Sequence, residues 1–388
     1  MADSEPLRDG GRSRAQSEDE RRWKILDGLP TPVPCGGVEA FAEEREAALA
    51  ASPACRANFE RYRANPYAVE VDYLPLRLDF ENVSRCNFHC VMCTVSDWPH
   101  GRRARDLSLE EFKRILDDQP GLLEIKVQGI GEPVMQGDPY FEMISHARAR
   151  RIWVRTTTNA SLLHLRDNAR KLVDSGANEI QISVDGADRE TFEAIRRGSV
   201  FSRVSANCRL INDYCRSLGV ERTKMWTVVQ SRNVDQLEAL VDVAANLGFT
   251  TQVFALNVGS WAVESWEGVA RELSVFDELD VDRLPPLVER GRARGVNVAF
   301  WVVRDRYRLG NPKTLCPWLF SRAFVSSDSR VVPCCIIGNP DTYQIDGEIG
   351  EERTLSDIWK GRAYVDFRRA HVEGNLPAVC RNCYHLPS

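Results

Sequence analysis

Three cysteines, Cys86, Cys90 and Cys93, stand close together in one short segment of the chain. The spacing C-x3-C-x2-C offers three thiolates from a single loop, whereas a structural zinc site takes four protein ligands. Three thiolates leave one coordination position of a metal open, and an open position is where chemistry can take place. The segment therefore predicts a reactive metal centre.

The same spacing resembles that of the radical S-adenosylmethionine (SAM) enzymes, and the surrounding sequence is similar to that family over most of the chain. The resemblance implies that the three thiolates hold three irons of a [4Fe-4S] cluster, while the amino and carboxylate groups of SAM chelate the fourth. One electron from the cluster would cleave SAM to methionine and a 5′-deoxyadenosyl radical, which abstracts a hydrogen atom from substrate. Thiolate ligation of iron–sulfur clusters is general.

A second motif, Gly129-Ile-Gly131-Glu132-Pro133, follows the next predicted strand. Glycines let the backbone approach a ligand closely, and a glutamate accepts hydrogen bonds from an ammonium group. The motif is similar to the G-G-E-P motif that binds the SAM amino group in the family, although here another residue separates the two glycines. Alone it more often marks a turn; its position one β/α unit after the cysteines favours SAM.

Further polar residues follow the third and fourth predicted strands. The resemblance suggests that Asn159 and Ser183 contact the ribose or the methionyl carboxylate of SAM, and that Arg196 pairs with that carboxylate. Asp185 is a candidate contact to SAM or substrate and a candidate general base. Helix caps, turns and a solvated helix end are the competing interpretations. Met92 stands where many relatives have an aromatic residue, and Met can also pack against adenine.

Four more cysteines, Cys316, Cys334, Cys380 and Cys383, lie near the C-terminus with the spacing C-x17-C-x45-C-x2-C. This pattern resembles the SPASM/twitch modules of radical SAM enzymes, in the shortened form that holds one auxiliary [4Fe-4S] cluster. A zinc ribbon with four thiolate ligands is the alternative that the ligand count permits. Cys335 is a candidate catalytic thiol able to return a hydrogen atom to substrate; replacement of Cys334 as ligand, or an inert buried thiol, are the other possibilities.

Strands and helices that would position these residues alternate from about residue 72. Six such units imply parallel strands joined by right-handed crossovers, and this number matches the α/β partial (β/α)6 TIM-like barrel of radical SAM enzymes. The cysteine loop would lie at the carboxyl ends of the strands, where barrel active sites lie. The candidate strands are 74–80, 123–127, 152–156, 179–183, 224–229 and 251–256, and the candidate helices are 108–118, 140–150, 165–175, 201–218 and 234–247.

The expected organisation has four parts: a disordered tail at 1–22, an N-terminal helical extension at 23–71, the barrel at 72–312, and the small Cys-rich auxiliary domain at 313–388. A further helix (276–294) and strand (296–303) would close the barrel segment, and a hairpin (320–326 and 330–333) would open the auxiliary domain.

Composition restricts the class of protein. The net charge of −5 argues against a general nucleic-acid binder, and no apolar run is long enough to span a bilayer. We therefore expect a cytoplasmic protein with no nucleic-acid or membrane partner. Twelve cysteines in a reducing compartment indicate metal ligation or catalysis more than disulfides.

The resemblance extends to the aminocyclitol-oxidising radical SAM dehydrogenases, and it implies two [4Fe-4S] clusters, SAM, and a flavodoxin- or ferredoxin-type reductant. We expect oxidation of a secondary alcohol in a sugar, aminocyclitol or aminoglycoside-type metabolite to a ketone, with the auxiliary cluster accepting the substrate electron. An epimerase that uses Cys335 and a peptide-modifying maturase are alternatives, although residues 1–70 show no strand-rich peptide-recognition fold. A zinc- or cluster-binding scaffold is the alternative without catalysis.

Overall fold

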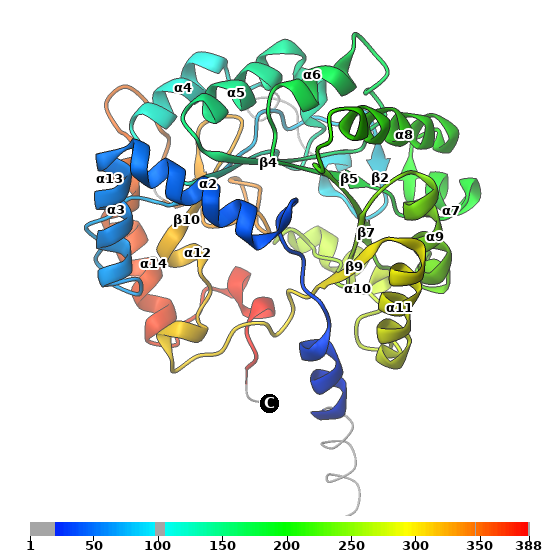
Figure 1. Ribbon diagram of the computed structural model, residues 1–388. Helices are drawn as coiled ribbons and strands as arrows, with labels where there is room; N and C mark the ends of the chain where they lie inside the picture. The colour runs from blue at the N-terminus through cyan, green and yellow to red at the C-terminus, as the bar shows by residue number, and fades with distance from the viewer. Residues whose placement is uncertain (1–19, 98–104, 346, 387–388) are drawn as a thin grey trace, which may run out of the picture.

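The computed structural model describes residues 20–97, 105–345 and 347–386. Its centre is a nine-stranded sheet with the order β11-β10-β1-β3-β4-β5-β7-β8-β9, in which only the β10–β11 pairing is antiparallel. Helices cover the outer face of the curved sheet (Figure 1). The strands are β1 Arg77–Phe80, β3 Glu124–Val127, β4 Trp153–Thr158, β5 Glu179–Ser183, β7 Thr223–Val228, β8 Thr251–Ala255, β9 Asn297–Trp301, β10 Arg322–Val325 and β11 Val331–Val332.

All six predicted barrel strands are present, with ends shifted by a few residues, and the α/β partial barrel is confirmed. The helices of the described residues alternate with them, and Ser108 and Glu111 form a capping box at the start of α4. The helices are α2 Gly37–Ala51, α3 Pro53–Ala64, α4 Leu109–Asp117, α5 Asp138–Ala149, α6 Asn168–Asp174, α7 Arg189–Ile195, α8 Phe201–Ser217, α9 Leu237–Asn246, α10 Glu267–Leu273, α11 Leu284–Arg294, α12 Trp318–Ser321, α13 Leu355–Lys360 and α14 Arg362–Val372.

Two strands extend the barrel beyond the six expected units. β9 pairs with β8, and β10, which the sequence places in a separate auxiliary domain, pairs with β1 in parallel. The predicted hairpin does form between β10 and β11, but its first strand belongs to the barrel sheet. The auxiliary segment is therefore joined to the barrel by main-chain hydrogen bonds.

The N-terminal part differs slightly from the expected organisation. Residues 1–19 of the predicted tail lie outside the described residues, whereas residues 20–28 form a helix. Helices α2 and α3 pack against the amino ends of the barrel strands, with Phe41 edge-on to Trp153 at 5.2 Å and Asn58 hydrogen-bonded to Leu74. In the described residues no helix is both long and apolar enough to cross a membrane.

Side-chain alternation along β1 explains why the barrel has an apolar outside and a charged inside. Leu78 and Phe80 are fully buried, and the Phe80 ring lies 4.8 Å from Phe112 of α4. Successive side chains of a strand point to opposite faces, so Arg77 and Asp79 face the barrel interior. Charged side chains in the barrel interior need compensating partners, and the ion pairs described below provide some of them.

Candidate active site

Cys86 follows the end of β1, Cys90 lies in a small two-stranded sheet, and Cys93 follows that sheet's first strand. In that sheet β2 (His89–Cys90) pairs antiparallel with β6 (Arg196–Arg197), and Cys90 stands opposite Arg196. The predicted ligand thiols Cys86, Cys90 and Cys93 are close enough to influence one another electrostatically. The structure therefore brings together the three cysteines that the spacing singles out.

Hydrogen-bond donors surround these sulfur atoms. The Phe88 N–H lies 3.4 Å from Cys86 Sγ, the Asn159 amide 3.8 Å from the same sulfur, and Arg196 Nη1 3.9 Å from Cys90 Sγ. Such donors stabilise negative charge on thiolates, and hydrogen bonds to sulfur tune iron–sulfur clusters.

Burial raises the pKa of Cys86 to about 12, and it also raises the pKa of Cys90 and Cys93. A thiol of this kind is protonated at neutral pH unless a metal binds it, because coordination deprotonates it outright. One buried thiol, Cys90, and two half-buried thiols, Cys86 and Cys93, with nearby N–H donors thus fit a metal cluster better than three free nucleophiles. In the described residues no three His, Cys, Asp or Glu side chains converge closely enough to hold a single metal ion; the ligands of a cluster bind different irons.

The Gly129–Glu132 loop packs directly against the cysteine loop. A Cβ built on Gly131 would lie 2.5 Å from the carbonyl oxygens of Val83 and Arg85, so the close approach requires glycine. The Glu132 N–H donates to Arg85 O at 2.9 Å. This contact fixes the predicted SAM-binding loop beside the predicted metal ligands.

Glu132 is 3% exposed and holds the next strand end in place. Its carboxylate accepts hydrogen bonds from Thr158 Oγ1 at 2.6 Å and from the Asn159 N–H at 2.7 Å. Burial raises its pKa to about 7. A buried carboxylate with little positive charge near it is suited to bind the ammonium group of SAM. Asn159 links this carboxylate to Cys86. Ser183 lies at the end of β5, half-buried.

Asp185 and Arg196 form a buried ion pair, with Arg196 Nη2 2.7 Å from Asp185 Oδ2. The other oxygen, Oδ1, accepts a hydrogen bond from the Val228 N–H at 2.8 Å. Burial raises the pKa of Asp185, and the Arg196 guanidinium opposes this. Asp185, expected as a general base, and Arg196, expected to bind the SAM carboxylate, thus partner each other, and the pair orients the guanidinium towards Cys90.

The four C-terminal cysteines gather at one place. Cys334 is influenced electrostatically by Cys316 and Cys380, and Cys383 by Cys316. Their pKa values are raised by burial, to about 11 for Cys316 and about 12 for Cys383. Half-buried thiols that raise one another's pKa are the donor set expected of a cluster held by four thiolates.

Cys335 lies between this group and the barrel interior, because the Cys316, Cys334 and Cys383 thiols all interact electrostatically with it. Asp79, Lys126, Arg77 and Arg322 also act on the Cys335 thiol electrostatically. Cys335 is therefore next to the four predicted ligand cysteines as well as to the charged side chains inside the barrel.

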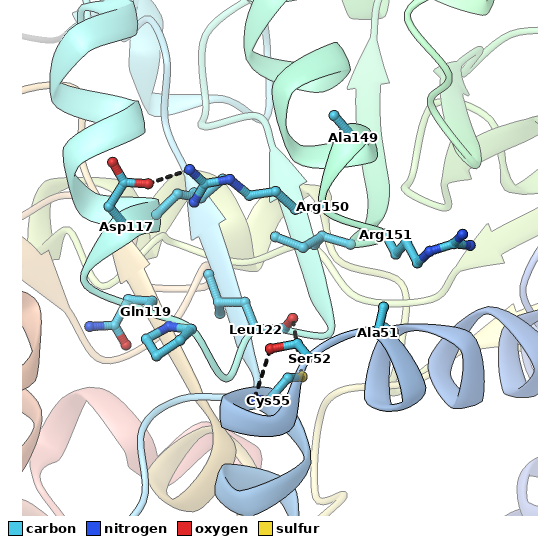
Figure 2. Close-up of a pocket in the computed structure, with 13 residues that line it drawn as sticks. Ala51, Ser52, Cys55, Asp117, Gln119, Leu122, Ala149, Arg150 and Arg151 are labelled. Carbon is cyan, nitrogen blue, oxygen red and sulfur yellow. Dashed lines mark hydrogen bonds and ion pairs between the residues drawn. The ribbon is translucent and has the colours of Figure 1, made fainter.

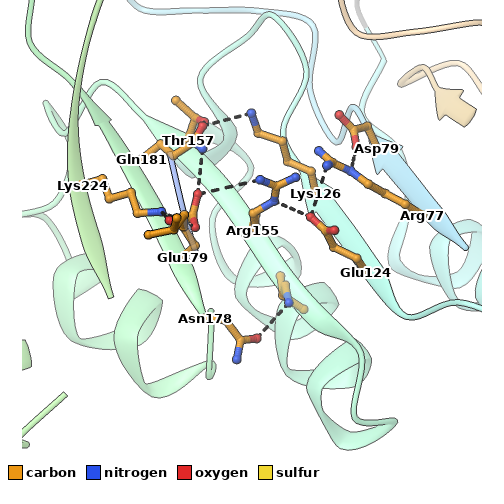
Figure 3. A network of polar contacts seen from close by, with 12 residues as sticks. Arg77, Asp79, Glu124, Lys126, Arg155, Thr157, Asn178, Glu179, Gln181 and Lys224 are labelled. Atoms are coloured by element: carbon orange, nitrogen blue, oxygen red, sulfur yellow. Dashed lines mark hydrogen bonds and ion pairs between the residues drawn. The ribbon is translucent and has the colours of Figure 1, made fainter. Parts of the chain in front are cut away.

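Those side chains form a network that the sequence analysis missed (Figure 3). Arg155 lies between Glu124, at 2.5 Å, and Glu179, at 4.0 Å, and Lys224 pairs with Glu179 at 2.6 Å. Lys126 donates to Gln181 at 3.2 Å. The signal was visible in the sequence, because charges at alternate positions of predicted buried strands must share one face.

Asp79 has one oxygen free of hydrogen bonds at the edge of this network. Oδ1 accepts from Arg77 Nε at 3.1 Å, while Oδ2 is buried and has no hydrogen-bond partner among the described residues. The Asp79 side chain is only 1% exposed. A buried polar atom without a partner is costly, so this oxygen marks a position where a ligand group would be favourable.

Glu81 is a further residue that sequence reasoning overlooked. It is fully buried, and its two oxygens accept from the Ile130 N–H at 3.3 Å and the Ser327 N–H at 3.2 Å. One carboxylate thus joins the SAM-type loop to the turn of the β10–β11 hairpin, which leads to Cys334. The acid directly after the first predicted strand was the available signal.

Two polar side chains that follow β8 make structural contacts. Trp261 Nε1 donates to the Met92 carbonyl at 3.2 Å, and Asn257 Oδ1 accepts from the Val303 N–H at 2.7 Å. Cys208 and Cys215 are buried in the core. A pocket of about 390 Å³ between α3 and the ends of α4 and α5 contains none of the predicted site residues, and includes Cys55 (Figure 2).

Comparison with known proteins is consistent with both cysteine groups. Residues 83–244 match the family described as the Radical SAM superfamily, and residues 316–384 match SPASM, described as an iron-sulfur cluster-binding domain. These domains bind a [4Fe-4S] cluster with SAM and additional auxiliary iron–sulfur clusters, respectively.

Among curated proteins, the chain is 32% identical over 196 residues to the mycofactocin maturase MftC of Mycolicibacterium smegmatis, covering 50% of this chain and 47% of the relative. It is 31% identical over 184 residues to GTP 3′,8-cyclase 1 of Pseudomonas aeruginosa, covering 46% and 52%. The chain thus spans about half the length of these relatives.

Two solved structures share the fold. SuiB of Streptococcus suis bound to SAM gives a TM-score of 0.62 at 18% identity, covering 81% of this chain and 71% of that one. The structure of anSMEcpe with bound AdoMet and the Cp18Cys peptide gives 0.58 at 19% identity, covering 80% and 88%.

Proposed function

We propose that this chain, a radical SAM domain followed by a SPASM-type iron-sulfur domain, oxidises a secondary alcohol of a sugar, aminocyclitol or aminoglycoside-type metabolite to a ketone. The observation that carries the proposal is the charged interior beside Cys335, where Asp79 offers an unpartnered oxygen. A barrel interior lined by charged and amide groups suits a small polyhydroxylated molecule better than an apolar one.

Each group in the site has an assigned role. When bound, SAM and the loop cluster supply the radical that removes a hydrogen atom from a substrate carbon. Cys86, Cys90 and Cys93 hold that cluster, and Glu132 accepts from the SAM ammonium. Asn159, Ser183 and the two glycines, Gly129 and Gly131, complete the SAM site, and the Asp185–Arg196 pair supports the cluster loop.

After a hydrogen atom has left the carbinol carbon, completing the oxidation requires the loss of the hydroxyl proton and one electron from the resulting substrate radical. Asp185 is already engaged with Arg196, so we assign the hydroxyl proton to Asp79 Oδ2, with Lys126 next to it. Burial lowers the pKa of Lys126, and its amino group interacts electrostatically with Asp79. Cys316, Cys334, Cys380 and Cys383 would hold the auxiliary cluster, which would supply the acceptor for the electron.

The test uses reconstituted protein, SAM, dithionite and a panel of aminocyclitols and sugars under anaerobic conditions. The proposal expects 5′-deoxyadenosine together with a product lighter by two hydrogen atoms that reacts with a hydroxylamine reagent. Solvent deuterium in a product of unchanged composition would instead indicate an epimerase with Cys335 as hydrogen donor. If SAM is cleaved but no compound of the panel shows either change, the proposed substrate class is refuted.

Peptide modification is the second candidate, and the similarity to a mycofactocin maturase favours it. A peptide substrate would place one side chain in the same barrel interior and leave the rest of its length outside. Incubation with a precursor peptide and detection of a mass change in that peptide distinguishes this candidate from the first. The zinc scaffold predicts zinc in place of iron and no SAM cleavage.

A further inference from the structure

The small β2–β6 sheet has one face towards the cluster loop and the other towards solvent. His89 stands opposite Arg197, and Cys90 opposite Arg196. Cys90 and Arg196 are each 8% exposed, whereas His89 and Arg197 are exposed. Because side chains alternate along a strand, the exposed pair lies one backbone layer away from a cluster ligand.

This outer face borders a surface hollow of about 450 Å³. Cys90 itself contributes to its lining, together with His89 and Arg197 from the small sheet, Arg232 from the segment after β7, and Trp266 and Val269 from the α10 region. Here a predicted ligand of the loop cluster borders a surface hollow.

The SAM-type loop lies on another side of the cysteine segment. Gly131 contacts the backbone of Val83 and Arg85, and Asn159 contacts Cys86. These contacts involve the start of the segment, whereas the hollow is next to its middle, at His89 and Cys90. Groups bound in the hollow would therefore not need to displace SAM.

The hollow has a basic rim and an apolar part. Arg197 and Arg232 are exposed and have no carboxylate partner among the described residues, and Arg232 only approaches the Ala194 carbonyl, at 3.5 Å. Glu272 is the one acid in the lining. Half-buried Trp266 and Val269 provide apolar contact area. Protein interfaces commonly combine an aromatic or apolar centre with a charged rim that selects the partner and speeds its approach.

We propose that this face, defined by His89, Arg197, Arg232, Trp266 and Val269, docks the acidic one-electron carrier protein that reduces the loop cluster. The proposal rests on the radical SAM assignment, because that chemistry needs one electron per SAM cleaved. In the step, the carrier is oxidised by one electron and the loop cluster is reduced by one; no proton or group moves. Acidic carboxylates of the carrier would pair with the two arginines.

The experiment compares the double variant Arg197→Glu/Arg232→Glu with the wild type and with Arg209→Glu. Arg209 is exposed on α8, so the control also reverses an exposed positive charge but outside the hollow. Anaerobic stopped-flow absorbance measures cluster reduction by a fully reduced bacterial flavodoxin, over a range of salt concentrations. A parallel series uses dithionite, a small reductant that needs no protein interface.

The expected result is a fall of about tenfold or more in the second-order rate constant with flavodoxin, within the range of electrostatic steering. The salt dependence should weaken in the double variant, while Arg209→Glu behaves as wild type. Dithionite-driven SAM cleavage and SAM affinity should be unchanged in all three proteins, which shows that the site is intact.

Three outcomes overturn the proposal. The first is reduction of the double variant by flavodoxin at the wild-type rate, and the second is no reduction of the wild type by flavodoxin. The third is a loss of the dithionite reaction in the double variant to the same extent as the loss of the flavodoxin reaction. A wild type that cleaves no SAM even with dithionite is a different result, because it refutes the radical SAM function itself.

Discussion

Replacement of Gly131 by alanine tests the contact between the SAM-type loop and the cysteine loop. The added Cβ would lie 2.5 Å from both the Val83 and the Arg85 carbonyl oxygens, and ordinary contact begins at 3.4 Å. The two loops must therefore separate by roughly 0.9 Å, the difference between these distances. Because both obstacles are backbone atoms, a side-chain rotation cannot relieve the clash.

Overpacking of this kind costs about 1–3 kcal/mol of stability. A displacement of about 1 Å near reacting groups can lower a rate by about 10²-fold. We therefore expect Gly131→Ala to unfold at lower urea concentration and to cleave SAM about a hundredfold more slowly with dithionite. The two assays are urea unfolding of the reconstituted protein and chromatographic measurement of 5′-deoxyadenosine.

Gly268→Ala is the matched control, since nothing lies within 4 Å of a Cβ built there and the residue is inside α10. It should gain about 0.5–1 kcal/mol, because alanine is the better helix former, and keep the wild-type rate. A Gly131→Ala protein with wild-type stability and SAM cleavage would refute the inferred packing of the two loops.

Three further predictions concern the charged network and the auxiliary cysteines. Glu179→Gln should lower the free energy of unfolding by about 3–5 kcal/mol, because it leaves the buried Lys224 without its ion-pair partner at 2.6 Å; an unchanged urea midpoint would contradict this. Burial alone would raise the pKa of Glu179, but Arg155 and Lys224 hold it below the ordinary 4.5. Its stabilisation should thus be present above pH 4.5 and lost as the pH falls through the lower folded-state pKa, so Glu179→Gln should lose less stability than wild type in acid unfolding curves. Cys334→Ala should lower the iron content from about eight to about four per chain, whereas Cys335→Ala should retain about eight; equal iron loss in both would show that the two thiols share the ligand role.

Local patterns in the sequence were sufficient for the six β/α units and for their capping. Apolar periodicity identified each strand within a few residues, and Ser108 with Glu111 identified the start of α4. The cysteine spacings identified two groups of thiols that the fold does bring together. These features depend on neighbours in the chain or on ligand spacing, so sequence alone carries them.

Such local patterns do not indicate which distant strands and side chains pair with one another. Nothing local indicates that β10 pairs with β1, because that register joins residues far apart in the chain and depends on the whole barrel. The partner of Asp185 was equally hidden: Arg196 is near in sequence, yet the ion pair forms only because β6 pairs with β2. The roles of Asp79 and Glu81 likewise depend on which strands become neighbours.

The most direct test of the account is electron paramagnetic resonance of the reduced, anaerobic protein with and without SAM. The account predicts two [4Fe-4S] signals, of which SAM changes the one lost in Cys90→Ala and leaves unchanged the one lost in Cys380→Ala. A single cluster, or two clusters of which neither responds to SAM, would contradict it.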